Sequence, residues 1–193
     1  MRKHLVIFVK APRLGRVKTR LAADIGVVAA WAFYRRTMAD VVRRLACDRR
    51  WRCWLAVTPD SATLRFANTA VIPQGAGDLG RRMARVFDTL PPGPAVIVGT
   101  DAPGITPAHI DRAFRALGSR AAVFGPAADG GYWLVGLKRS PNVREIFRNV
   151  RWSSRFALAD TVANLDAKPA LLETLIDVDD GESLAAWHAS HSP

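Results

Sequence analysis

The chain has 193 residues, of which 49% are hydrophobic, and a formal net charge of +11. This length and apolar content fit one compact domain with a full core, spanning residues 1–193. No apolar run approaches the roughly 20 residues that cross a membrane. Lys10 ends the first apolar run, and no small-residue cleavage site follows it. We therefore expect a cytoplasmic protein with no membrane span.

The positive charge is carried by 28 lysines and arginines. A basic composition is typical of nucleic-acid-binding proteins. Most of these arginines are dispersed, however, and pairs such as Arg35–Arg36 and Arg43–Arg44 fall on the polar sides of predicted helices. The charge pattern therefore favours solvated helix faces and a small anionic substrate over a surface for duplex nucleic acid.

The two cysteines, Cys47 and Cys53, are six positions apart, and no third or fourth soft ligand lies near them. This is not the spacing of a zinc site. We expect both thiols to be reduced and to lie in or near the core, because disulfides are uncommon in the cytoplasm.

Strand-like and helix-like segments alternate along the chain. Short apolar runs predict strands, and apolar residues three or four positions apart predict helices. In chain order we expect a strand at 4–9, a helical region at 17–46 broken at Gly26, a strand at 51–57, a helix at 61–68, a strand at 70–73, a helix at 79–90, a strand at 95–98, a helix from Thr106–Pro107 to 118, strands at 121–125 and 131–137, helices at 143–149 and 154–164, an apolar stretch at 171–178 and a last helix at 180–188. This alternation predicts an α/β fold in which helices cover both faces of a mostly parallel sheet.

A lone carboxylate, Asp101, follows the apolar run 95–98, at the point where a buried strand ends. Ligands of open α/β sheets bind at the carboxyl ends of strands, and a carboxylate there suits a hard cation such as the one that accompanies a nucleoside diphosphate. The alternative is structural, because Asp also caps helices and stabilises turns such as the one before Pro103.

Two connections from a strand to a helix have the composition of phosphate- or ligand-binding loops. The segment 10–20 carries five basic residues around a proline and a glycine, and it leads into a helix N-terminus, a geometry that favours phosphate. It is not a P-loop, since Pro12 and Val17 stand where that motif has glycine. In the second connection, 74–81, three glycines allow close approach to a ligand, or Asp78 caps the next helix.

Two further segments carry carboxylates. Asp129, Gly130 and Gly131 form a tight turn or a ligand contact ahead of Tyr132. Near the C-terminus, the carboxylates at 177 and 179 lie on one side of an extended segment. They complete a Mg²⁺ or Mn²⁺ site with the carboxylate at 101, or Asp179 or Asp180 caps the last helix.

Five motifs occur in a fixed order: Phe8–Pro12, Gly15–Leu21, Gly77–Gly80, Gly99–Pro103 and Asp129–Leu137. Together they resemble a bacterial family of unassigned function in the GT-A superfamily of nucleotide-diphospho-sugar transferases, whose members are described as glycosyltransferases, some of them associated with arsenosugar biosynthesis. The superfamily also contains the molybdopterin and phospholactate guanylyltransferases. The resemblance spans residues 4–187 and implies a three-layer, Rossmann-like GT-A fold with a mostly parallel mixed sheet.

The resemblance also implies roles for individual residues. A Mg²⁺ or Mn²⁺ ion is expected at Asp101, with Asp177 or Asp179 as the second acidic position, and Asp129 is the candidate catalytic base or acceptor-orienting group. The residues expected around the nucleotide and its phosphates are Lys10, Ala11, Pro12, Gly15, Lys18, Arg20, Gly77 and Asp78, and those expected around the sugar or acceptor are Gly130, Gly131 and Tyr132.

The leading hypothesis is a metal-dependent transferase that passes a glycosyl group from a nucleoside diphosphate sugar to a small-molecule acceptor. The first alternative is a nucleotidyltransferase that joins a nucleoside triphosphate to a phosphorylated small molecule and releases pyrophosphate. GT-A glycosyltransferases often carry two aspartates around one residue, and the single Asp101 is closer to the nucleotidyltransferase pattern. The second alternative is a non-catalytic nucleic-acid-binding protein.

Overall fold

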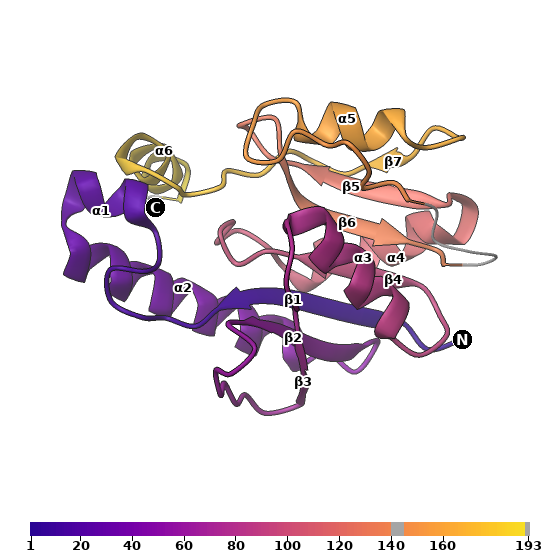
Figure 1. Ribbon diagram of the computed structural model, residues 1–193, viewed down its shortest axis with the longest axis horizontal. Helices are drawn as coiled ribbons and strands as arrows, with labels where there is room; N and C mark the ends of the chain where they lie inside the picture. Colours follow the sequence, from indigo (N-terminus) through magenta and orange to yellow (C-terminus); the bar gives the residue numbers. More distant parts are fainter. Residues whose placement is uncertain (140–144, 192–193) are drawn as a thin grey trace.

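The computed structural model describes residues 1–139 and 145–191, and a seven-stranded sheet forms its centre (Figure 1). The spatial order of the strands is β3-β2-β1-β4-β6-β5-β7. Strands β4 and β5 pair antiparallel with β6, and the other neighbouring strands are parallel. The strands are β1 (His4–Lys10), β2 (Arg52–Thr58), β3 (Thr69–Pro73), β4 (Ala95–Val98), β5 (Ala122–Pro126), β6 (Tyr132–Leu137) and β7 (Ala170–Leu171).

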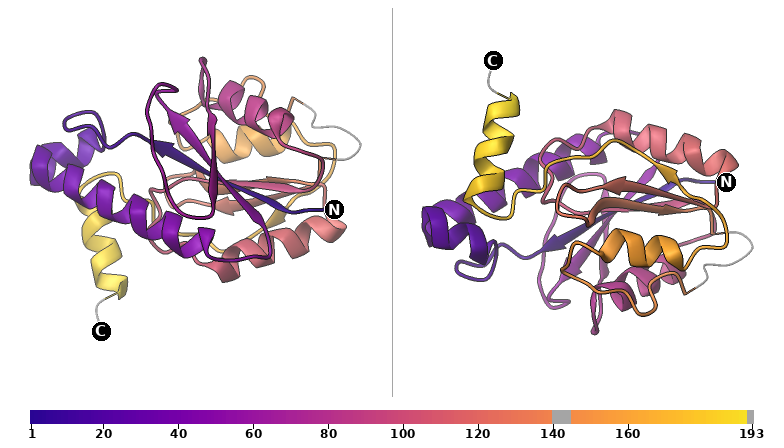
Figure 2. Two further views of the ribbon diagram at one scale, coloured as in Figure 1. Left: turned by 90° about the horizontal axis from the view of Figure 1, so that it is seen from below. Right: turned by 90° about the horizontal axis from the view of Figure 1, so that it is seen from above.

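Helices cover both faces of this sheet, as the two views in Figure 2 show. Helices α2 and α4 pack on one face, and α3 and α5 pack on the other. The helices of the described residues are α1 (Thr19–Ile25), α2 (Val27–Ala46), α3 (Leu79–Thr89), α4 (Pro107–Ser119), α5 (Ala157–Ala163) and α6 (Gly181–His191). The prediction of a three-layer α/β/α fold with a mostly parallel mixed sheet is confirmed.

Strand β1 has an almost continuously apolar sequence because helices cover it on both faces. Leu5, Ile7 and Val9 face α2 and α4, whereas Val6 and Phe8 face α3. A strand that is covered on both faces needs apolar side chains at odd and even positions alike. Each fully buried Val, Leu or Ile contributes roughly 1.5–3 kcal/mol to folding, which fixes this strand at the centre of the sheet.

The carboxyl ends of β1, β2, β3 and β4 meet at one edge of the sheet because these strands are parallel. Strand β6 enters from the same edge, since it is antiparallel to β4 and pairs Leu134 with Val98. The backbone N–H of Gly99 donates to the carbonyl oxygen of Trp133 at 3.3 Å. The loop after β4 and the start of β6 are therefore held side by side.

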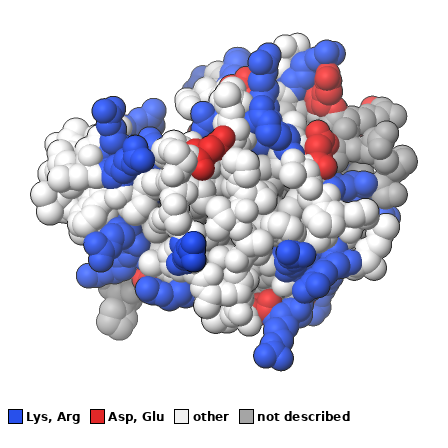
Figure 3. Space-filling view, turned by 60° about the horizontal axis from the view of Figure 1, so that its bottom comes forward, with Lys and Arg blue, Asp and Glu red and all other residues white. Residues whose placement is uncertain are grey.

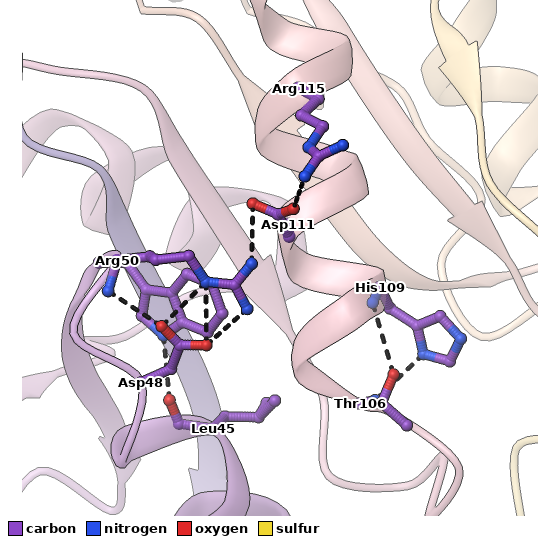
Figure 4. A network of polar contacts seen from close by, with 8 residues as sticks. Leu45, Asp48, Arg50, Thr106, His109, Asp111 and Arg115 are labelled. Atoms are coloured by element: carbon purple, nitrogen blue, oxygen red, sulfur yellow. Dashed lines mark hydrogen bonds and ion pairs between the residues drawn. The ribbon is translucent and has the colours of Figure 1, made fainter.

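Helix α4 begins as the sequence predicts, with Thr106 as its N-cap and Pro107 in its first turn. The Thr106 hydroxyl accepts from the backbone N–H of His109, and the His109 ring accepts from the backbone N–H of Thr106, which forms a capping box (Figure 4). Arg50 links the turn before β2 to α4 through an ion pair with Asp111 at 3.1 Å.

The prediction of a helix at 61–68 is wrong. Residues 62–66 have no regular secondary structure and 67–68 form a turn, while Ala62, Leu64 and Phe66 pack against the core at every second position, which is not the period of a helix. Residues 146–149 form turns where a helix at 143–149 was predicted, and positions 143 and 144 lie outside the described residues. Helix α5 covers only the central part of the predicted 154–164.

The two cysteines differ from each other. Cys53 is buried as expected, but Cys47 is exposed at the end of α2, so the prediction that it lies in or near the core is wrong. Among the described helices, none is long and apolar enough to span a membrane.

Candidate functional site

A cavity of about 470 Å³ opens at the edge of the sheet where the parallel strands end. Its walls come from the ends of β1 and β4, the start of β6, the first turn of α1, helix α3 and the segment before α6. This is the edge at which open α/β sheets bind ligands, because diverging loops leave a crevice there.

Three carboxylates gather in this cavity. Asp101, Asp177 and Asp179 each offer one oxygen, and these oxygens lie within 4.8 Å of one another. The backbone N–H of Val178 donates to the Asp101 carbonyl oxygen at 2.9 Å, which ties the two segments together. Val178 is fully buried, so its two acidic neighbours point the other way, into the cavity. Three converging carboxylate oxygens are a donor set that suits Mg²⁺ or Mn²⁺.

Lys18 lies within this acidic cluster. Its Nζ is 2.5 Å from Asp101 Oδ1 and 2.6 Å from Asp179 Oδ1, and its side chain is only 5% exposed. Burial by itself would lower the Lys18 pKa, but the adjacent Asp101 and Asp179 outweigh burial and hold this pKa above its ordinary value. The Lys18 backbone is left-handed, with φ 47° and ψ 49°. This conformation is costly for a lysine, and such strain is commonest at functional positions.

Asp177 is the least satisfied member of the cluster. Its Oδ1 is buried and has no hydrogen-bond partner among the described residues. Burial, and next the charge of Asp101, raise the pKa of Asp177 to about 8. A buried carboxyl oxygen without a partner is costly, and a bound cation would remove that cost.

Two residues that the sequence analysis did not select support the site from α2. The Tyr34 hydroxyl accepts from the Lys10 backbone N–H at 2.9 Å and donates to the Lys10 carbonyl at 2.8 Å, where β1 ends. Arg44 donates to the carbonyls of Pro103 at 3.1 Å and Ile105 at 2.7 Å, in the loop that follows Asp101. The sequence marked Arg44 only as part of a polar helix face.

The structure separates the predicted site residues into two groups. The first group lines the cavity, and the second lies outside it. The first contains Lys10, Lys18, Arg20, Asp101, Tyr132, Asp177 and Asp179, and the second contains Ala11, Pro12, Gly15, Gly77, Asp78, Asp129, Gly130 and Gly131.

Three residues of the second group, outside the cavity, stabilise local structure instead. Asp78 Oδ1 accepts from the Arg81 backbone N–H and caps α3. Asp129 is exposed, and its Oδ1 accepts from the Gly131 backbone N–H at 2.9 Å, within a turn. Gly130 has a φ of 86°, and a Cβ there would overlap the Arg155 carbonyl oxygen. Asp78, Asp129 and Gly130 therefore each have a structural role in a helix cap or a turn.

Solved structures of other proteins share this fold. A protein from Desulfovibrio desulfuricans G20, provisionally described as a nucleotide-diphospho-sugar transferase, is 25% identical over 100% of this chain and 89% of its own, with a TM-score of 0.90. The 2-C-methyl-D-erythritol 4-phosphate cytidylyltransferase of Thermus thermophilus is 12% identical over 98% of both chains, with a TM-score of 0.59. Rv0371c from Mycobacterium tuberculosis H37Rv, solved as a manganese complex, is 18% identical over 98% of this chain and 100% of its own, with a TM-score of 0.52.

The fold is therefore the Rossmann-like one shared by nucleotidyltransferases and GT-A nucleotide-sugar transferases. The profile of the DUF2064 family, described as uncharacterized proteins conserved in bacteria, matches residues 37–154, and the chain belongs to this family. The predicted resemblance is confirmed at this level. No curated protein matches the chain.

Proposed function

We propose that this protein is a divalent-cation-dependent transferase that passes a glycosyl group from a nucleoside diphosphate sugar to a small-molecule acceptor. The observation that carries the proposal is the convergence of Asp101, Asp177 and Asp179 in a cavity at the carboxyl edge of a GT-A-like sheet. The manganese bound by Rv0371c and the description of the Desulfovibrio protein support the same kind of chemistry.

The acidic cluster fits a Mg²⁺ or Mn²⁺ ion, because it combines three oxygen donors with one buried, unpartnered oxygen. Asp101, Asp177 and Asp179 would hold the ion. When bound, the ion supplies positive charge that neutralises the leaving diphosphate. Exposed Lys10 and Arg20 on the cavity wall would contact the same phosphates.

Lys18 has a distinct part in this proposal. The Lys18 ammonium now bridges Asp101 and Asp179. A cation held by the same carboxylates would compete with it, because like charges repel at short distance. A Lys18 ammonium displaced from a carboxylate would be available to a phosphate at the same site.

Residues at the start of β6 would serve the sugar or acceptor. Tyr132 lines the cavity, and the turn of Asp129, Gly130 and Gly131 immediately precedes it in the chain. Asp129 lies close enough to the cluster to raise the Asp177 pKa, although less than burial and Asp101 do. We assign Asp129 as the group that orients the acceptor or takes its proton.

Nucleotidyl transfer is the second candidate, and a specific observation favours it. The loop after β4 carries the single Asp101, without a second aspartate two positions away. In this reaction a phosphorylated acceptor attacks the α-phosphorus of a nucleoside triphosphate, and pyrophosphate leaves with the electron pair of the broken P–O bond. The same cavity, cation and basic residues would serve both reactions.

Nucleic-acid binding without catalysis is the remaining alternative. On the face drawn in Figure 3, lysine and arginine side chains lie in separate groups with uncharged surface between them. A protein that binds a duplex needs cations that converge on one surface, and its binding weakens steeply with salt.

A thermal-shift screen with Mn²⁺ distinguishes these functions, because a ligand that binds the folded state raises the unfolding temperature. Stabilisation by a nucleoside diphosphate sugar that is lost in Asp101→Ala supports glycosyl transfer. Stabilisation by a triphosphate alone supports nucleotidyl transfer, and no response to either refutes both. Asp40→Ala is the matched control, since Asp40 is 52% exposed, pairs only with Arg43 at 3.6 Å among the described residues and lies on α2, away from the cavity.

A further inference from the structure

Gln74, directly after β3, is a buried polar residue in the cavity wall, and it is only 4% exposed. Its amide nitrogen donates to two carbonyl oxygens, that of Val9 at 3.2 Å and that of Ala56 at 2.8 Å. The side chain therefore lies across the carboxyl ends of β1 and β2. The sequence analysis noted only the glycines that follow it.

The backbone of Gln74 is fixed as well. Its N–H donates to the Val57 carbonyl at 3.2 Å, and its carbonyl accepts from Arg85 Nη1 at 2.7 Å. The same guanidinium donates to the Ala76 carbonyl at 3.0 Å and fills the space where a Cβ of residue 75 would lie. Four partners thus fix Gln74 in the absence of a ligand: the carbonyls of Val9, Ala56 and Val57, and the guanidinium of Arg85.

These contacts decide which atom Gln74 presents to the cavity. Both hydrogens of the amide nitrogen are used, so a flip would place the amide oxygen against two carbonyl oxygens and cost both hydrogen bonds. The remaining polar atom is Oε1. It accepts no hydrogen bond from the described residues, and it is not among their fully buried, unpartnered atoms. Gln74 therefore offers the cavity a fixed acceptor and no donor.

The surroundings of this acceptor are apolar. Phe8 from β1 and Met83 and Leu79 from α3 line the same cavity, and Met83 is only 3% exposed. The acidic cluster lies at the ends of β1 and β4, whereas Gln74 lies toward β2 and β3 beside Thr58, so the cavity has a charged end and a second end where apolar side chains surround the fixed acceptor of Gln74. A flat, apolar ring with an N–H on its edge matches this second end.

We propose that Gln74 is the residue that selects the nucleobase of the substrate, by accepting a hydrogen bond from an N–H on the base edge through Oε1. This inference rests on the proposed use of a nucleotide. A base that turns a carbonyl or ring nitrogen toward Oε1 leaves two acceptors facing each other in an apolar place, and sites built around one hydrogen bond discriminate strongly for that reason.

The test compares binding of CDP, UDP, GDP, ADP and inorganic pyrophosphate, with Mn²⁺ present, to the unaltered protein and to Gln74→Met. Methionine keeps the length and volume of the side chain but loses the acceptor. We expect the unaltered protein to prefer one diphosphate over the least favoured one at least 10-fold. In Gln74→Met, the affinities for the most and least favoured diphosphates should differ by less than about 3-fold. The affinity of this variant for pyrophosphate should stay within about 3-fold of that of the unaltered protein.

Asn164→Leu is the matched control. Asn164 is another amide clamp, which donates to the carbonyls of Ile146 at 2.9 Å and Arg148 at 2.7 Å, and it does not line the cavity. Its loss should lower the unfolding temperature and leave the base preference unchanged. A base preference that persists in Gln74→Met overturns the inference, and so does equal binding of all four diphosphates by the unaltered protein. If no diphosphate binds, it is the proposed function that fails.

A second measurement needs no variant and therefore holds even if Gln74→Met does not fold. The preferred diphosphate is compared with its analogue methylated at the N–H groups of the Watson–Crick edge. The methylated analogue should bind the unaltered protein at least 10-fold more weakly. Equal affinity overturns the assignment of Gln74 Oε1 as an acceptor for the base.

Discussion

Replacement of Lys18 by methionine should tighten the binding of Mn²⁺ in the absence of nucleotide. In the free protein the Lys18 ammonium bridges Asp101 and Asp179, at 2.5 Å and 2.6 Å, and so neutralises part of the cluster. A metal ion has to displace it. Lys18→Met removes the competing cation, keeps most of the side-chain volume and leaves all three carboxylates in place.

The size of the effect follows from the exposure of the partners. Removing one member of a buried ion pair costs about 3–5 kcal/mol, and an exposed pair is worth about 0.2–1 kcal/mol. Lys18 is 5% exposed, but Asp101 and Asp179 are 42% and 45% exposed, so solvent screens the carboxylates. We take an intermediate value of about 1–3 kcal/mol, which corresponds to roughly a 5- to 150-fold lower Kd for the ion.

Isothermal titration of the metal-free protein with MnCl₂ measures this change. Lys10→Met is the control, because the Lys10 side chain also belongs to the cavity wall but is exposed and forms no ion pair within the described part of the chain. It should change the metal affinity by less than about 3-fold. If Lys18→Met binds Mn²⁺ equally or more weakly, the ammonium does not compete with the ion, and the reasoning is refuted.

The same variant should show the opposite effect on phosphates. Lys18→Met should weaken the binding of nucleoside diphosphates much more than that of the corresponding nucleosides, since only the former meet the released ammonium. An equal loss for both ligands would argue against a contact between Lys18 and phosphate.

Three further predictions concern single residues elsewhere in the fold. Burial lowers the pKa of His109, so the unfolded chain binds more protons than the folded one below pH ~6.5, and the folded state loses stability as the pH falls. Urea unfolding at pH ~7.5 and ~5.5 should show a smaller loss of stability in His109→Gln than in the unaltered protein. An identical loss in the two proteins would contradict the assignment. Burial raises the pKa of Cys53 to about 12, so a thiol reagent should label only exposed Cys47 at neutral pH and both thiols in denaturant, whereas labelling of two thiols in the native protein would rule this out. Gly130→Ala should lower the free energy of unfolding by about 2 kcal/mol or more, because φ is 86° and the new Cβ meets the Arg155 carbonyl; a neutral result in urea unfolding would show that the turn can shift.

Local patterns determined much of the fold. Apolar runs that are buried on both faces became the central strands, and Thr106 before Pro107 fixed the start of α4. The spacing of the last carboxylates also sufficed to place Asp177 and Asp179 on one side of the chain, since alternate residues of an extended segment share a side. Asp101 could be predicted as a site residue because it follows a buried strand. These features depend on neighbours within a few residues, which is what a sequence shows directly.

Other features depended on contacts between distant segments. Residues 61–68 did not form the expected helix, because Ala62, Leu64 and Phe66 pack against the core at every second position. Lys18 lies 161 positions from Asp179, and its pairing arises only when β1, β4 and the C-terminal segment meet at one edge of the sheet. Gln74 is likewise a plain polar residue in the sequence, and it becomes a fixed acceptor because its amide hydrogens reach two carbonyls from other strands. The sequence by itself determined most of the strands and helices, and it indicated that Asp101, Asp177 and Asp179 come together, because these features follow from burial and local spacing. Only the tertiary structure decided the partners of Lys18 and Gln74, because hydrogen bonds and ion pairs between distant segments exist only once the sheet has assembled.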